Sequence, residues 1–175
     1  MSVSLRSALL GALILAIVLA LGVWAVAGLG LYDFAADVPH TVPVRNFINY
    51  ARDHSVSARL SDITVPTLTD PKMIAAGAGA YDRICSGCHL GPGIKENALR
   101  AGLYPKPPSF ARRRRPGNAA EQFWDVKHGF KMSAMPAWGT SLSDADIWNI
   151  VAFFQTLPKQ TPESYKALVA AAPPG

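Results

Sequence analysis

The sequence predicts an all-α protein, because every element that its patterns indicate is a helix. An uncharged apolar run extends from Ala8 to Leu31. Later in the chain, residues that favour helix N-termini stand before apolar residues at helical spacing, at Asp70-Pro71, Asn118 and Ser143. A chain of 175 residues has room for one domain plus appendages. We therefore expect four parts: an N-terminal membrane anchor (1–31), a connector (32–70), a folded domain (71–158) and a C-terminal tail (159–175).

The apolar run is long enough to span a membrane. Residues 8–31 carry no charge, and a helix of that length rises about 36 Å at about 1.5 Å per residue. A cleaved signal peptide is the alternative, since Ala25-Val26-Ala27 resembles a cleavage site, although a signal peptide's apolar region is usually shorter, about 7–15 residues. Arg6 precedes the run, whereas Asp33 and Asp37 follow it. This bias predicts a cytoplasmic N-terminus.

Within the connector, residues 32–70, the sequence indicates one short amphipathic helix from Val44 to Leu60. Its apolar positions would be Phe47, Ile48, Val56 and Leu60. His40 and His54 also lie in this part of the chain. Without companion ligands nearby they are interpreted as polar contacts of the connector, although a role as copper or second-haem ligands stays open.

The first helix of the domain should begin with Asp70 as its N-cap and Pro71 at its first position, and should end at Ile84. Gly77 and Gly79 each cost a helix roughly 1 kcal/mol relative to Ala. The presence of glycine despite this cost predicts that another helix approaches this face of the helix closely. The last helix, Ser143–Leu157, has apolar residues on one face and is expected to cross here.

Two segments separate these helices. Residues 90–117 form a loop rich in Pro and Gly, which is reasonable in a small domain only if it wraps a cofactor. A short helix then opens with a capping box at Asn118–Glu121 and stops at His128-Gly129, where Gly can adopt a left-handed conformation. Residues 159–175 suggest no function.

Both cysteines of the chain lie in the stretch Cys85-Ser86-Gly87-Cys88-His89. This spacing is typical of c-type haem attachment: the two thiols add to the vinyl groups of one porphyrin, and His89 binds the iron as an axial ligand. A structural zinc site would need a second ligand pair, which the sequence lacks. A thioredoxin-like redox pair would follow a strand, whereas a helix is expected before Cys85.

A haem iron that carries electrons needs a sixth ligand, and a methionine thioether raises its potential. Met135, followed by Pro136, is the candidate. Met132 and His128 are the alternatives as ligands, and a methionine that only packs in the core is a further interpretation. A high-spin iron with an open site, as in a peroxidase or gas sensor, would require that Met135 not bind.

Positive charge is concentrated in the domain. Residues 71–158 hold 11 Lys and Arg against 6 Asp and Glu, within a formal net charge of +5 for the chain. The four arginines Arg112–Arg115 either dock a partner, pair with a haem propionate, or form a solvated loop. The charge favours redox partner proteins with an acidic docking face. Nucleic acid and a small-molecule substrate are not expected.

Residues 71–158 resemble a class I monohaem cytochrome c of the membrane-anchored bacterial type. The resemblance depends on Gly77 and Tyr81 before the cysteines, on Cys85/Cys88/His89, on Met135-Pro136 and on the terminal helix. It implies an all-α fold of three main helices around one covalent haem c, with His89 and Met135 as iron ligands. It also implies a proline carbonyl that supports His89, which could belong to Pro92, Pro105 or Pro107.

The function expected from this resemblance is electron transfer rather than catalysis. The chain would be a single-pass protein of the bacterial inner (cytoplasmic) membrane, with its haem domain in the periplasm, and would carry single electrons between redox proteins. The alternative is a fixed haem c subunit of a larger membrane oxidoreductase, either a dehydrogenase or a terminal oxidase.

Overall fold

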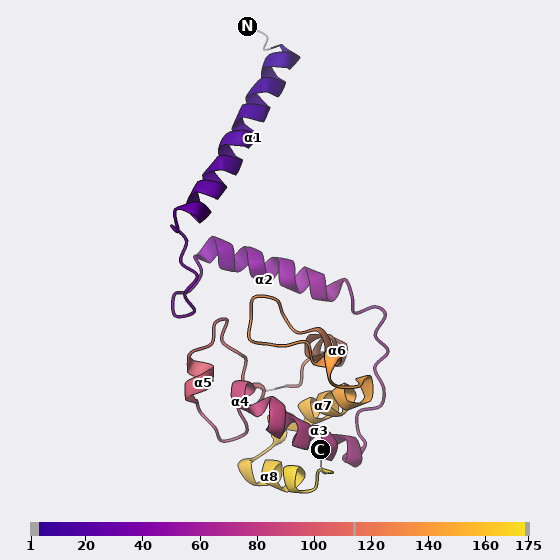
Figure 1. The fold of residues 1–175 in the computed structure, drawn as a ribbon. Coiled ribbons are helices and arrows are strands. Elements are labelled where there is room, and N and C mark those ends of the chain that lie inside the picture. Colours follow the sequence, from indigo (N-terminus) through magenta and orange to yellow (C-terminus); the bar gives the residue numbers. More distant parts are fainter. Residues whose placement is uncertain (1–3, 114, 174–175) are drawn as a thin grey trace. The chain divides into compact units, whose positions relative to one another are not determined.

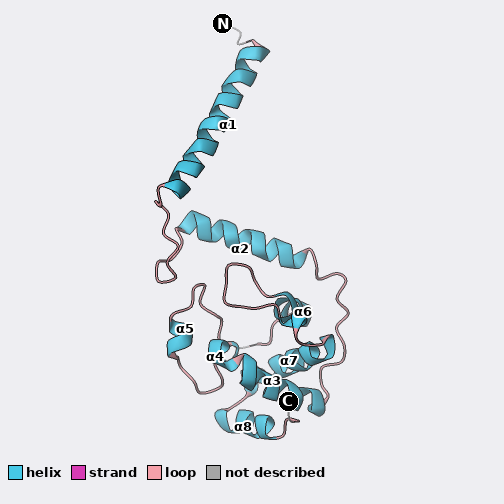
Figure 2. Cartoon of the chain, in the orientation of Figure 1, coloured by secondary structure: helices cyan, strands magenta, loops and turns pink. Residues whose placement is uncertain are grey.

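The computed structural model describes residues 4–113 and 115–173, and the chain divides into two compact units, Met1–Val38 and Pro39–Gly175. All regular structure in the described residues is helical (Figure 2). The predicted all-α class is therefore confirmed. Figure 1 labels the helices in chain order, and each unit is described by itself.

The first unit consists mainly of α1, Leu5–Gly28. The side chain of Ser4 caps this helix by accepting a hydrogen bond from the backbone N–H of Ser7. None of the helix residues is buried. Its length and apolar composition would allow it to cross a membrane.

The second unit begins with α2, Val42–Ser57, two residues earlier than the predicted start. Val44 and Ile48 are half-buried and Val56 is buried, and α2 lies against α6, Ala119–His128. Phe47, which was expected on the packed face, is instead 72% exposed. The packed face of α2 therefore contains two of the four predicted apolar positions, Ile48 and Val56, together with Val44. The fourth position, Leu60, is half-buried but lies after the end of the helix.

The core forms where α3, Pro71–Ile84, crosses α7, Asp144–Thr156. A Cβ atom at Gly77 would overlap the backbone carbonyl of Asn149. The close approach predicted from the glycines is therefore present. Tyr81 is fully buried at this crossing and contacts the rings of Phe153 and Phe154.

Local capping explains where the remaining long helices begin. Asp70 caps α3 through the N–H of Lys72, and Asn118 caps α6 through two backbone N–H groups. Ser143 forms a reciprocal capping box at α7. Gly129 ends α6 with a φ of 60°, as predicted for that glycine. Short elements complete the unit: α4 (Ser86–His89), α5 (Ala98–Ala101), η1 (Phe110–Arg112), η2 (Trp138–Thr140) and η3 (Leu157–Lys159).

The predicted tail contains a further helix, α8, Pro162–Ala170, that was not expected there. This helix lies against α3 (Figure 1). Tyr165 is buried there, and its hydroxyl donates a hydrogen bond to Oδ1 of Asp82 at 2.8 Å. The burial of Tyr165 makes α8 part of the same core as α3 and α7.

Candidate functional site

The motif Cys85-Ser86-Gly87-Cys88-His89 forms a single helical turn directly after α3. The backbone carbonyl of Cys85 accepts hydrogen bonds from the N–H groups of Cys88 (3.1 Å) and His89 (2.9 Å). Both cysteines are free thiols. Burial, with Cys88 close by, raises the pKa of the Cys85 thiol to about 12. One turn therefore presents two thiols and an imidazole together.

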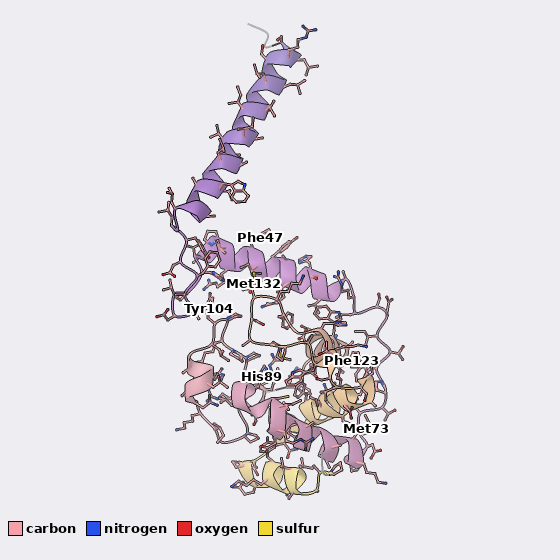
Figure 3. The ribbon with its side chains drawn as sticks, in the orientation of Figure 1. Phe47, Met73, His89, Tyr104, Phe123 and Met132 are labelled. Atoms are coloured by element: carbon pink, nitrogen blue, oxygen red, sulfur yellow. The ribbon has the colours of Figure 1, made fainter. Side chains whose placement is uncertain are left out.

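His89 is buried in the interior of the second unit (Figure 3). Its Nδ1 lies 2.8 Å from the backbone carbonyl oxygen of Pro108, to which it donates. Burial lowers the pKa of His89, and the charges of Arg100 and Arg113 lower it further, against the opposing effect of the Pro108 bond. This direction favours the neutral imidazole, and in that form the bond to a carbonyl oxygen places the proton on Nδ1. Nε2 has no hydrogen-bond partner among the described residues and is available to a metal.

The supporting carbonyl belongs to Pro108, rather than to Pro92, Pro105 or Pro107. All four prolines lie within the loop formed by residues 90–117. The sequence carries no signal that separates them, because the choice depends on how the loop folds back over α4.

Aromatic stacking fixes the plane of the imidazole. The ring of Phe110 is stacked on His89, with centroids 4.7 Å apart and planes 19° apart. Phe154 of α7 supports Phe110 at 4.8 Å, and the guanidinium of Arg113 lies 4.9 Å from the Phe110 centroid. The imidazole is thus held at its edge by Pro108 and on its face by Phe110.

Two arginines of the predicted run, Arg112 and Arg113, contact other parts of the loop. Arg112 donates to the backbone carbonyls of Ile94 and Lys95, and Arg113 covers Phe110. Arg115 is exposed. Arg114 lies outside the described residues. These contacts tie the loop to itself, which the sequence-based alternatives did not include.

The loop that carries Met135 is closed by its own backbone. The N–H of Phe130 donates to the carbonyl of Met135 (3.1 Å), and the hydroxyl of Ser133 bridges the Phe130 carbonyl and the Met135 N–H. A Cβ atom at Gly129 would come within 2.5 Å of the Pro136 backbone, so only glycine fits there. Met135 is half-buried against the core, whereas Met132 is 78% exposed.

A family model described as "Cytochrome C oxidase, cbb3-type, subunit III" matches residues 72–154. These residues are a cytochrome c domain. A search of curated proteins and a search of solved structures each gave no significant match. A cytochrome c domain implies a haem cofactor, haem-based electron transfer and redox partner proteins.

The residues present in the cytochrome c domain fit a haem. His89 is buried, and its Nδ1 is already bound, as in histidine metal ligands generally. The two thiols are within the same helical turn. The hydroxyl oxygen of Ser109, next to Pro108, is buried and has no partner among the described residues, which is compatible with a polar group being bound beside it.

The other histidines of the cytochrome c domain and its connector contact aromatic residues. The backbone N–H of His40 donates to the hydroxyl of Tyr104 (3.1 Å). Nδ1 of His54 lies 2.9 Å from the carbonyl of Tyr50, on the same helix. His128 is exposed beside Trp124. Among the described residues, no three His, Cys, Asp or Glu side chains gather as a metal site would require.

Proposed function

We propose that this chain is a membrane-anchored periplasmic c-type cytochrome that carries single electrons between redox proteins. One haem would be bound covalently to Cys85 and Cys88, with His89 and Met135 as the axial ligands of its iron. The observation that carries the proposal is the buried His89, which follows the cysteine pair in one turn and has Nδ1 fixed by Pro108.

The protein's contribution to electron transfer is to keep the ligands in place in both oxidation states. Bound haem supplies an iron that alternates between the ferrous and ferric states. Pro108 and Phe110 hold the imidazole of His89 at its edge and face. The hydrogen bonds of the Phe130–Met135 loop limit movement of the thioether. Ligands that move little keep the reorganisation on each transfer small.

The choice of Met135 over Met132 follows from burial. Met135 is half-buried against the core, and its backbone is bound at both N–H and carbonyl. Met132 is 78% exposed and has a φ of 57°. A ligand from a fixed, half-buried position loses less conformational freedom on binding than one from an exposed position.

The anchor would keep the domain close to its partners. α1 has the length and composition of a membrane span, and the charges that flank it favour a periplasmic domain. Tethering raises the effective concentration of partners in the same membrane. The basic domain favours partners with an acidic docking face.

The test is purification of the full chain from gently solubilised membranes, followed by native separation, haem staining and analysis of metals and flavins. The proposal expects a stained band with one haem per chain that survives denaturation, which shows covalent attachment. A chain without haem, or with haem that denaturation releases, would contradict it.

The same separation tests the alternative of a fixed subunit in a larger oxidoreductase, since the matching family is described as an oxidase subunit. Migration near the mass of the single chain supports the carrier. Co-migration with further haems, copper or flavin would show a fixed subunit of a larger complex and would reject the free carrier.

Replacing the proposed sixth ligand tests the iron site. Met135→Ala should leave haem attached but lower the reduction potential, because loss of the thioether removes the ligand that raises it. Met132→Ala is the matched control and should leave the potential unchanged. Equal effects of the two substitutions, or an unchanged potential in Met135→Ala, would reject Met135 as the ligand.

A further inference from the structure

The loop segment that supports His89 has an unusual shortage of hydrogen-bond donors. Pro107 and Pro108 are consecutive, and neither has a backbone N–H. Their carbonyl oxygens are therefore the groups through which this backbone can be held by hydrogen bonds. The Pro108 carbonyl accepts from His89. The position of that carbonyl depends on what holds its neighbour.

Arg100 holds the neighbouring carbonyl. Its Nε–H donates to the carbonyl oxygen of Pro107 at 2.9 Å. Arg100 belongs to α5 and is only 8% exposed, a degree of burial that arginine rarely reaches unless its charge is paired. A planar guanidinium presents donors in a fixed fork, so its orientation fixes the direction of the bond to Pro107.

Glu96 fixes the orientation of that guanidinium. One terminal nitrogen of Arg100 lies 3.1 and 3.0 Å from the two carboxylate oxygens of Glu96. The ammonium of Lys106 reaches the same carboxylate at 2.6 Å. The Lys106 and Arg100 bonds together hold the pKa of Glu96 at about 2, so the carboxylate stays charged. Residues 96, 100 and 106 are thus joined directly before the two prolines.

We propose that Arg100, oriented by Glu96, is a positioning residue for the proximal ligand: it holds the Pro107-Pro108 backbone so that the Pro108 carbonyl accepts the Nδ1 proton of His89. This inference depends on the proposed haem ligation by His89. Arg100 acts through Pro107 and Pro108 and is not assigned any contact with haem.

The consequence is control of the reduction potential through a hydrogen bond. A carbonyl that accepts the Nδ1 proton makes an imidazole a stronger donor to iron. A stronger donor favours the ferric state. If the segment loosens, the bond is made less of the time and the potential rises.

Arg100→Lys is the informative variant, because it keeps the positive charge near the site but loses the fork that binds Pro107 and Glu96 together. Arg112→Lys is the matched control. Arg112 also donates to backbone carbonyls of the loop, but these belong to Ile94 and Lys95 and not to the prolines. Both variants would be made in the full chain with haem attached, in lipid nanodiscs. The readouts are the exchange rate of the His89 Nδ1 proton by NMR of the reduced protein, and the potential.

Arg100→Lys should accelerate Nδ1 proton exchange by about tenfold, the effect of about 1.4 kcal/mol. It should raise the reduced-to-oxidised ratio at a fixed poise about threefold, which is about 28 mV at 59 mV per tenfold change. Arg112→Lys should do neither. Unchanged exchange and potential in Arg100→Lys, or equal changes in Arg112→Lys, would overturn the inference.

Glu96→Gln keeps the experiment decisive if Arg100→Lys fails to retain haem. It leaves Arg100 in place but removes the charge that orients it, so exchange of the His89 Nδ1 proton should again accelerate. An unchanged exchange rate would overturn the proposal that Glu96 orients Arg100. Exchange alone is read here, because the lost negative charge shifts the potential by itself. Failure of the proposed function would appear separately, as a wild-type chain without covalent haem.

Discussion

Replacing Asp125 with asparagine should remove a pH dependence of stability near neutral pH. Oδ1 of Asp125 is buried in α6 without a hydrogen-bond partner among the described residues. Burial, reinforced by the charges of Glu121 and Asp53, raises the pKa of this carboxyl from 3.8 to about 7, while Arg52 and Arg113 oppose the rise. The charged form is therefore the disfavoured one in the folded protein.

The sign and size follow from linkage. Since the pKa of Asp125 is higher in the folded state, its stabilising contribution is complete below about pH 4 and is lost as the pH rises through about 7. The difference between 3.8 and about 7 gives at most about 4 kcal/mol at about 1.36 kcal/mol per unit. The side chain is only half-buried, so with solvent screening we expect about 1–2 kcal/mol. Asparagine does not ionise and should show no such loss.

The assay is urea unfolding of the full chain in detergent at pH 5 and pH 8, followed by haem absorbance. Asp125→Asn should unfold at a higher urea concentration than wild type at pH 8, and the advantage should shrink at pH 5. Asp62→Asn, at an exposed carboxylate of the connector, should follow wild type at both values. The reasoning would be refuted if the difference in urea midpoint between wild type and Asp125→Asn were the same at pH 5 and pH 8.

Two further substitutions test the core by equilibrium denaturation. Gly77→Ala should destabilise the domain by about 1–3 kcal/mol, because the new methyl overlaps the Asn149 carbonyl; Gly102→Ala, whose nearest neighbour is 3.8 Å away, is the control, and similar losses would contradict the overlap. Tyr165→Phe should cost about 0.5–1.5 kcal/mol through loss of the bond to Asp82. An unchanged midpoint would mean that this bond adds nothing.

Features set by neighbouring residues could be predicted from the sequence. Asp70, Asn118 and Ser143 all cap the helices that they were expected to begin, since a cap involves only the next three residues. The close approach at Gly77 could also be predicted, because glycine lowers helix stability relative to Ala and is therefore expected within a helix mainly where a neighbouring backbone leaves no room for a side chain.

Features set by long-range packing could not be predicted in the same way. The bond from His89 to Pro108 joins residues 19 positions apart, across a loop segment with several prolines. The helix α8 has a capping box and Pro162 at its first turn. Its short apolar pattern nevertheless gave no reason to expect that Tyr165 would reach Asp82 on α3. Phe47 likewise fits an apolar helical pattern but is exposed.

The prolines of the loop also change how its positive charge should be interpreted. Prolines remove backbone donors, so carbonyls of this loop are bound by side chains: Arg100 binds the Pro107 carbonyl and Arg112 those of Ile94 and Lys95. Each arginine used in this way adds positive charge that serves the fold. In the described part of residues 95–115, two exposed cations have charged groups without a hydrogen bond, an ion pair or an aromatic contact to the protein. They are Lys95 and Arg115. A hydrogen bond to a carbonyl does not neutralise a cation, so the exposed Arg112 and Arg113 keep their charge for a redox partner. The carboxylate of Glu96 offsets part of the charge of Arg100 and Lys106, and Arg100 is the arginine whose bonds lead to His89.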